Sequence, residues 1–373
     1  MNEYLSFYEK YKISPVVQDI DNFKEHVRRR NNLYRQLGAS HLIFKDKDIL
    51  EIGPGGGYNA LVTYSYGPKT YTLIEPSTQG YHELKNNFKN LDKNVFIFNE
   101  MLEEFKAIKQ YDIIICEGLI PGLSSKEQFI KIIQSLLKPN GIFIMTTSDQ
   151  VSVFFEIIRK YMANVLIKDI EDIDEKVKIL VDSFSSHLDT LKGMTRSYSD
   201  WCLDNLVGDA ILEHTLSIND AIELLKNNYI LGISPNIFNN YSWYKQLPTN
   251  TFEYNQVFQE QMLEKWHNFI DYRFIQKDRD YKSNIELSKY CLELIKAIKN
   301  SDDKIKIVDI LEKIKINLKS DIEKETLLAI EEAIEVINDS ITPTKIKNMK
   351  FFNSAFGRGQ AYISFVKENI DYE

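Results

Sequence analysis

The chain has 373 residues, of which 43% are hydrophobic, and its formal net charge is -8 at pH 7. This length exceeds one typical domain, and the composition is sufficient for a substantial core with an additional module. The acidic balance argues against a surface that holds a nucleic acid backbone, because such proteins usually carry a basic face.

The cysteines and the apolar runs indicate the cellular compartment in which the protein is expected. The first ten residues lack the basic and apolar regions of a signal peptide, and no run approaches the roughly 18 apolar residues of a membrane span. Cys116, Cys202 and Cys291 are widely separated and odd in number, which suggests neither a disulfide framework nor a zinc site. We therefore expect a cytoplasmic protein with no membrane span and no bound metal.

The first predicted helix runs from about Asp19 to Leu37. Apolar residues recur there at helical spacing, and Gly38 supplies a stop. The helix carries a basic cluster that includes Arg30, and a solvated basic face explains this cluster as well as a ligand contact does.

The stretch from Asp48 to Asn59 is an apolar β-type run that ends in a glycine cluster and leads into a helical pattern. A backbone without side chains at Gly53, Gly55 and Gly57 can approach a ligand closely, and the next helix offers unpaired N–H donors. A dinucleotide fingerprint would need glycine or alanine where this chain has Tyr58. Dinucleotide binding is therefore the least favoured function of this turn.

The spacing Glu51-x-Gly53-x-Gly55-x-Gly57 resembles motif I of the class I S-adenosylmethionine-dependent methyltransferases. In that family the acidic residue at the strand end faces the ammonium group of the ligand. The resemblance implies that Glu51, the three glycines and Asn59 bind the cofactor. It also implies that the preceding helix lies against this site, with Arg30 or Tyr34 touching the ligand carboxylate.

Two later strand ends fit the same ligand. The predicted strand Tyr71 to Ile74 ends in Glu75 and Pro76, and an acidic side chain at the end of a second strand can accept both ribose hydroxyls. The predicted strand Val95 to Phe98 ends in the residues that the family places beside adenine. These are an acidic or amide residue and a following apolar one, here Asn99, Glu100 and Met101. An ordinary helix start also explains this last group.

The predicted fourth strand, Tyr111 to Cys116, is almost wholly apolar, as a central parallel strand should be. It ends in Glu117, where class I enzymes place residues that face the transferred methyl group. The Asn/Asp-Pro-Pro-Tyr/Phe signature of nucleic-acid and glutamine amino methyltransferases is absent, and no nucleophile elbow supports acyl transfer. A fifth strand, Gly141 to Thr147, follows a Leu-Lys-Pro-x-Gly turn that is also typical of the family.

Strands that alternate with helices over residues 48–148 predict an α/β fold, a Rossmann-like, doubly wound and mostly parallel sheet that binds ligands at the carboxyl ends of its strands. The family has seven strands. We expect the sixth at Tyr229 to Ile233, after a helix that Ser217 caps, and the antiparallel seventh at Ala361 to Lys367.

Large helical insertions interrupt this predicted sheet. The methyltransferase core is expected to comprise residues 1–150, 215–235 and 350–373. Residues 151–214 are expected to form a helical cap over the active site, and residues 236–349 a second helical module for substrate or oligomerisation. The i, i+3, i+4 apolar stripes of the second module are typical of core packing, and a homo-oligomer through it is a further expectation.

Methyl transfer is an in-line displacement, so the enzyme mainly holds the acceptor close and aligned, and a hydroxyl acceptor also needs a base. His187 with Asp189 is the first candidate for this base, although a purely structural role for His187 fits the sequence equally. His214 is the second candidate. Glu117 either serves as base or orients the cofactor, and His267 is a further candidate.

The sequence therefore predicts an S-adenosyl-L-methionine-dependent methyltransferase that acts on a hydroxyl or amine of a small-molecule or sugar acceptor. A protein or peptide methyltransferase is one alternative. A protein that binds the cofactor without methylating, and that serves assembly, is another. The layout also resembles bacterial methyltransferases of uncharacterised substrate that are associated with surface polysaccharide synthesis.

Overall fold

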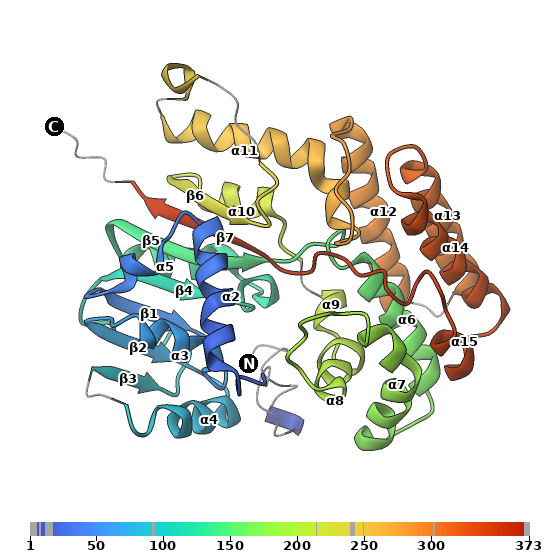
Figure 1. Ribbon diagram of the computed structural model, residues 1–373, viewed down its shortest axis with the longest axis horizontal. Helices are drawn as coiled ribbons and strands as arrows, with labels where there is room; N and C mark the ends of the chain where they lie inside the picture. Colours follow the sequence, from blue (N-terminus) through green and yellow to red (C-terminus); the bar gives the residue numbers. More distant parts are fainter. Residues whose placement is uncertain are drawn as a thin grey trace. The chain divides into compact units, whose positions relative to one another are not determined.

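The computed structural model describes residues 6, 9–11, 18–91, 94–213, 215–238, 243–248, 250–300 and 303–368. Within these ranges the chain divides into two compact units. The first comprises residues 1–147, 216–260 and 360–373, and the second comprises residues 148–215 and 261–359. Figure 1 traces the chain through both.

The first unit is built on a seven-stranded sheet with the order β3-β2-β1-β4-β5-β7-β6. The neighbours from β3 to β5 pair in parallel, whereas β7 is antiparallel to both β5 and β6. The strands are β1 (Asp48–Ile52), β2 (Thr70–Ile74), β3 (Val95–Phe98), β4 (Tyr111–Cys116), β5 (Leu137–Thr147), β6 (Asn228–Ser234) and β7 (Ala361–Lys367). The predicted fold class and the predicted seventh strand are thus confirmed.

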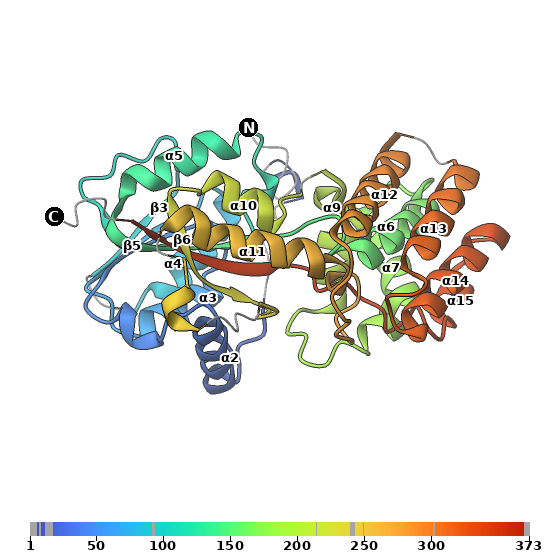
Figure 2. The same ribbon diagram turned by 90° about the horizontal axis from the view of Figure 1, so that it is seen from above.

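Helices cover both faces of this sheet, with α2 and α3 on one face and α5 and α10 on the other (Figure 2). Ser217 caps α10 through a capping box with Asp220, as its sequence position predicts. The helices of this unit are α2 (Phe23–Gln36), η1 (His41–Phe44), α3 (Tyr58–Ser65), α4 (Thr78–Phe88), η2 (Ile120–Gly122), α5 (Lys126–Leu136), α10 (Ile218–Leu224), η4 (Tyr244–Gln246) and most of α11 (Thr251–Lys265).

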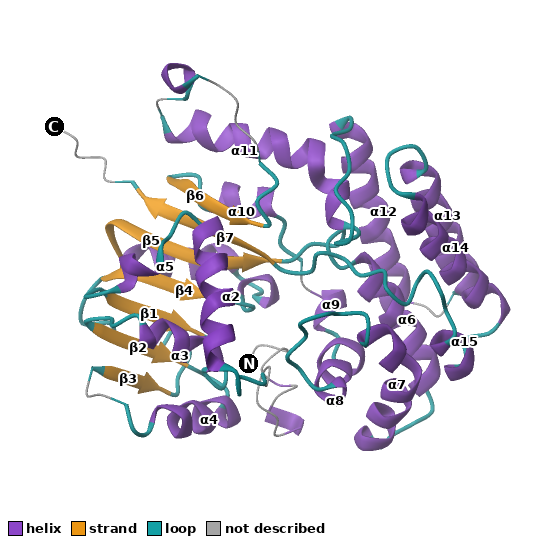
Figure 3. Cartoon of the chain, viewed as in Figure 1, coloured by secondary structure: helices purple, strands orange, loops and turns teal. Residues whose placement is uncertain are grey.

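The second unit consists of helices and connecting loops, with no strand among its described residues (Figure 3). Its helices are α6 (Phe154–Ile167), α7 (Ile173–Leu188), α8 (Tyr198–Cys202), η3 (Leu203–Val207), α9 (Ala210–Glu213), η5 (Trp266–Phe269), α12 (Tyr281–Asn300), α13 (Lys304–Leu318), α14 (Lys324–Asp339) and α15 (Pro343–Lys347). Their apolar stripes are buried, which is the packing that the i, i+3, i+4 spacing indicates.

The unit boundaries differ from the predicted insertions at two places. Residues 236–260 belong to the first unit, where Asn255 of α11 accepts a hydrogen bond from the Ile230 amide of β6 (3.1 Å) and donates to the Asn228 carbonyl (2.8 Å). These bonds satisfy backbone groups of the edge strand. Residues 350–359 belong to the second unit.

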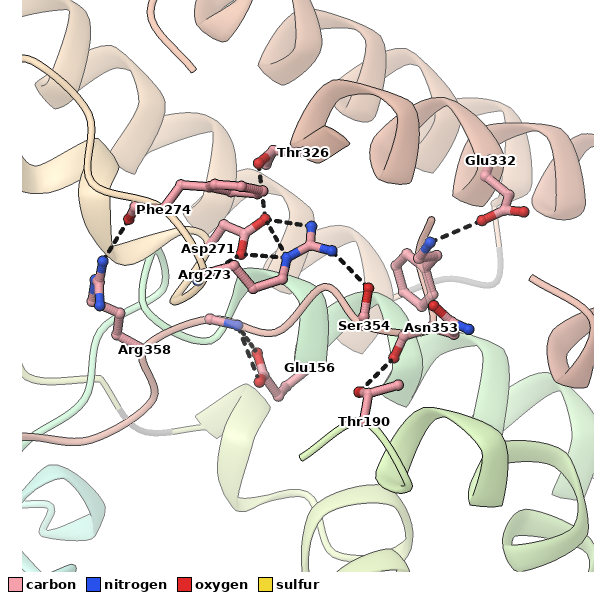
Figure 4. Close-up of polar contacts among 12 residues, drawn as sticks. Glu156, Thr190, Asp271, Arg273, Phe274, Thr326, Glu332, Asn353, Ser354 and Arg358 are labelled. Atoms are coloured by element: carbon pink, nitrogen blue, oxygen red, sulfur yellow. Dashed lines mark hydrogen bonds and ion pairs between the residues drawn. The ribbon is translucent and has the colours of Figure 1, made fainter. Parts of the chain in front are cut away.

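Residues 350–359 form a segment without helix or strand, and backbone amides of this segment donate hydrogen bonds to charged side chains of the second unit (Figure 4). Glu332 of α14 accepts from three consecutive amides, those of residues 350–352, at 2.7 to 2.8 Å. Glu156 of α6 accepts from the Gly357 amide at 3.2 Å. A Cβ atom at Gly357 would lie 1.9 Å from the Ser152 carbonyl oxygen, so only glycine fits this crossing.

Two kinds of feature are absent from the described residues. None of the helices combines the length and the apolar character that a membrane crossing requires. No group of three or more His, Cys, Asp or Glu side chains in these ranges could hold a metal ion.

Candidate functional site

The glycine turn between β1 and α3 has the backbone that its sequence predicts. Gly53, Gly55 and Gly57 all have positive φ, at 68°, 56° and 83°. At Gly57 a Cβ atom would also lie 2.3 Å from a methyl carbon of Leu84, so conformation and space both require glycine there. Gly57 is the N-cap of α3 and offers no capping side chain, so first-turn amides of α3 stay available to a ligand.

Glu75 lies at the end of β2, directly against the glycine turn. Its carboxylate accepts from the Gly55 amide at 2.7 Å and from the Ser77 amide at 2.8 Å. Burial raises the pKa of Glu75 to about 7, and these two bonds oppose the shift because they favour the charged form. A carboxylate has about four acceptor positions, so two stay available for hydroxyl groups of a ligand.

The end of β3 is tied to the end of β2. The Asn99 side chain donates to the carbonyl oxygens of Glu75 (2.8 Å) and Pro76 (3.2 Å). Glu100 and Met101, the next two residues, are partly buried. The structure thus brings Glu75, Pro76 and Asn99 together at one end of the sheet.

Helix α2 contributes a buried ion pair beside the first strand. The two terminal nitrogens of Arg30 donate to the two carboxylate oxygens of Glu117, at 2.5 and 3.1 Å, and only 7% and 12% of these side chains is exposed. Arg30 also donates to the Tyr34 hydroxyl at 2.7 Å, and the Asn59 amide donates to Glu117 at 3.1 Å. Residues from α2, α3 and the end of β4 therefore meet in one polar cluster.

Glu51 is a deeply enclosed carboxylate, comparable with Glu75. It is 4% exposed and accepts a hydrogen bond from the Tyr71 hydroxyl of β2. Burial raises the pKa of Glu51 to about 7, and the negative charge of Glu117 adds to the shift, whereas the Tyr71 bond and Arg30 oppose it. A carboxyl group that titrates near neutrality gains its charge readily when a cationic ligand group approaches.

Comparison with known proteins agrees with this arrangement, since residues 23–185 match the profile of a methyltransferase domain. The chain is an S-adenosylmethionine-dependent methyltransferase. Its cofactor is S-adenosylmethionine.

Relatives of this methyltransferase include the ubiquinone biosynthesis O-methyltransferases of two Rickettsia species. The protein from Rickettsia typhi is 26% identical over 190 residues, which cover 48% of this chain and 75% of the relative. The protein from Rickettsia bellii is 22% identical over 219 residues, or 55% of this chain and 85% of the relative. The solved structure of PKMT2 from Rickettsia typhi in complex with AdoHcy is 17% identical, with a TM-score of 0.44, and the match covers 65% of this chain and 50% of that one.

The predicted base His187 has no free ring nitrogen in this methyltransferase. In the packed interior of the second unit, its Nε2 bonds to the Ile346 carbonyl (2.9 Å) and its Nδ1 accepts from Arg159 (3.3 Å). Burial lowers the pKa of His187 to about 3, and the charge of Arg159 adds to this. Since a base needs an available lone pair, these contacts argue against the predicted role and favour the structural one.

The other predicted bases differ in their surroundings. Asp189 is exposed at the end of α7 and accepts from the Tyr198 hydroxyl. His267 is buried in η5, with Nε2 bonded to the Lys277 carbonyl at 3.0 Å, and its pKa is lowered to about 4 by burial. His214 lies outside the described residues. Glu117 is bound by Arg30, which favours its orienting role over its role as base.

Sequence reasoning missed three residues of the polar cluster. Tyr71 bonds Glu51, and Tyr362 of β7 lies close enough to Arg30 and Glu117 for their charges to act on it. His26 lies on the same buried face of α2 as Arg30 and Tyr34. The signal for His26 was its spacing of four residues from Arg30 and eight from Tyr34, which places all three on one face of a helix.

Proposed function

We propose that this methyltransferase acts on a hydroxyl group of a small-molecule or sugar acceptor. The observation that supports a hydroxyl over an amine is the likeness to two relatives named O-methyltransferases, of which the match covers 75% and 85%. The acceptor oxygen must be held in line with the bond that breaks, which is the task of the residues around the strand ends.

We further propose which residues contact each part of the cofactor. S-adenosylmethionine, when bound, supplies an electrophilic methyl group on a sulfonium. Glu75 accepts the ribose hydroxyls beside the turn formed by Gly53, Gly55 and Gly57, and Asn99, Glu100 and Met101 border the adenine. This proposal rests on the acceptor positions that Glu75 leaves free, on the hydrogen bond from the Gly55 amide to the Glu75 carboxylate, and on the bond from Asn99 to the Glu75 carbonyl.

The amino acid end of the cofactor is zwitterionic and needs charges of both signs. Arg30 suits its carboxylate, because the Nε atom of Arg30 is buried and has no partner among the described residues. Glu51 and Glu117 suit its ammonium group. The ion pair between Arg30 and Glu117 thus places a positive and a negative side chain side by side, one for each charged group of the ligand.

The test is a screen of acceptor classes with the full chain. S-adenosylmethionine is incubated with catechol, simple phenols, nucleotide sugars, glycans, primary amines and peptides, and mass spectrometry identifies S-adenosylhomocysteine and the methylated product. We expect an O-methylated product from a phenol or sugar, and its loss in Glu75→Ala. Methylation confined to amines or peptides would contradict the proposed acceptor.

A further inference from the structure

One titratable group in the polar cluster has no role in the cofactor assignment. His26 is 8% exposed and lies on α2 one turn before Arg30, on the buried face that both share with Tyr34. Its Nε2 atom is buried and has no partner among the residues that the structure describes. A buried polar atom without a partner is costly, so this nitrogen points to a ligand.

The hydrogen bonds of His26 determine which ring nitrogen carries the proton. The hydrogen bonds of the ring with the Tyr58 backbone and with the Asn59 side chain raise the pKa of His26. A hydrogen bond raises this pKa when the partner accepts a proton from the ring. Since Nε2 has no partner, these bonds are made through Nδ1. We therefore assign the ring proton to Nδ1, which leaves a lone pair on Nε2.

The surroundings also keep this imidazole neutral. Burial lowers the pKa of His26 below 6.5, and the positive charges of Arg30 and then Arg29 add to this lowering. The carboxylate that faces α2 is Glu117, and it is paired with Arg30, whereas α3, β6 and η1 contain no Asp or Glu. His26 is thus a neutral acceptor at pH 7.

A lone pair on Nε2 accepts a proton from an O–H or N–H group. The cofactor ammonium already has two carboxylates in its proposed place, Glu51 and Glu117, and the cofactor carboxylate has no proton to give. The acceptor hydroxyl is the ligand group that this lone pair fits. Asn59 links the two parts of the site, because it bonds both His26 and Glu117.

We propose that His26 is the catalytic base that takes the proton of the acceptor hydroxyl, an inference that rests on the proposed hydroxyl acceptor. The acceptor oxygen forms a bond to the methyl carbon while the bond between this carbon and sulfur breaks, and the electron pair of that bond stays on sulfur. The acceptor proton moves to Nε2 of His26. The resulting imidazolium returns this proton to water, and S-adenosylhomocysteine leaves as a neutral thioether.

The first test needs no acceptor. Long-range proton–nitrogen NMR of the full chain with labelled histidine, bound to S-adenosylhomocysteine, reports the protonation of each ring nitrogen, and His26→Asn assigns the signal among the six histidines. We expect Nδ1 protonated, Nε2 unprotonated at pH 7.5, and a pKa below 6.5. A proton on Nε2 at pH 7.5 would overturn the proposal.

The second test separates catalysis from cofactor binding. His26→Asn should lower kcat on the best hydroxyl acceptor about 100-fold and abolish the fall in rate below pH 6.5, as expected on removal of a general base. Its affinity for S-adenosylhomocysteine by calorimetry should stay unchanged. His82→Asn, an exposed histidine of α4, should match the wild type in both measurements.

The outcomes distinguish this inference from the proposed function. Equal methylation of a hydroxyl acceptor by wild type and His26→Asn would overturn the role of His26 and leave the proposed function intact. A large loss of S-adenosylhomocysteine affinity in His26→Asn would also overturn it, because His26 would then serve the cofactor. A panel in which no hydroxyl is methylated would overturn both.

Discussion

A chain truncated after Phe352 is expected to be insoluble and to bind no cofactor. The truncation removes β7, which lies between β5 and β6 and pairs with both along its length. It also removes the buried side chains of Ile363, Phe365 and Val366, each of which contributes about 1.5 to 3 kcal/mol by burial. This sum is comparable with the whole stability of a typical domain, roughly 5 to 15 kcal/mol, and two strand edges are left unpaired.

A point variant tests the contribution of β7 without removing the segment that precedes it. Ser364 is the strand residue opposite both Ile144 and Gly232, so Ser364→Pro removes a ladder donor from a central strand and should give insoluble protein. Ser364→Ala loses only the hydroxyl bonds to the Leu37 and Gly232 carbonyls and should stay soluble. The measurement is the soluble fraction after expression. A soluble truncated chain that binds S-adenosylmethionine would refute the role of β7.

Replacement of Arg30 by methionine is expected to destabilise the protein by about 3 kcal/mol, because it leaves the carboxylate of Glu117 buried without its partner. The measurement is the free energy of unfolding in urea. Arg30→Met should also weaken the binding of S-adenosylmethionine, since the proposed site loses its cation for the ligand carboxylate.

The control is a double-mutant cycle with Glu117→Gln. Removing both charges leaves no unpaired ion, so Arg30→Met with Glu117→Gln should be more stable than Arg30→Met alone. Strictly additive losses in the two single variants would mean that the buried pair contributes nothing to the fold.

The first unit could be predicted closely because its signals are local. The apolar runs of β3, β4 and β7 are bounded by turn residues, and the structure gives these strands the predicted limits. Strand β5 begins at Leu137 rather than at Gly141, because Leu137 already pairs with Tyr111 of β4. The register then shifts between Tyr111 and Ile113, and the pairing continues beyond this irregularity. No local pattern indicates such a shift.

The candidate base could not be predicted because its environment is set by contacts between distant residues. His187 is enclosed by Arg159 of α6 and by the Ile346 carbonyl of α15, 28 and 159 residues away. His26 resembles any polar residue of a basic helix until the packing shows which face of α2 is buried. The places of the cap and of any oligomer contact stay predictions for the same reason.

The most direct test of a cofactor site at the strand ends is calorimetric titration of the protein with S-adenosylmethionine and S-adenosylhomocysteine, with NAD as control ligand. Wild type and Glu104→Ala, which alters an exposed glutamate, should bind both adenosyl ligands saturably and should not bind NAD. Glu75→Ala should lose this binding while it remains folded. Undiminished binding by folded Glu75→Ala, or tighter binding of NAD than of S-adenosylmethionine, would contradict the site described for this methyltransferase.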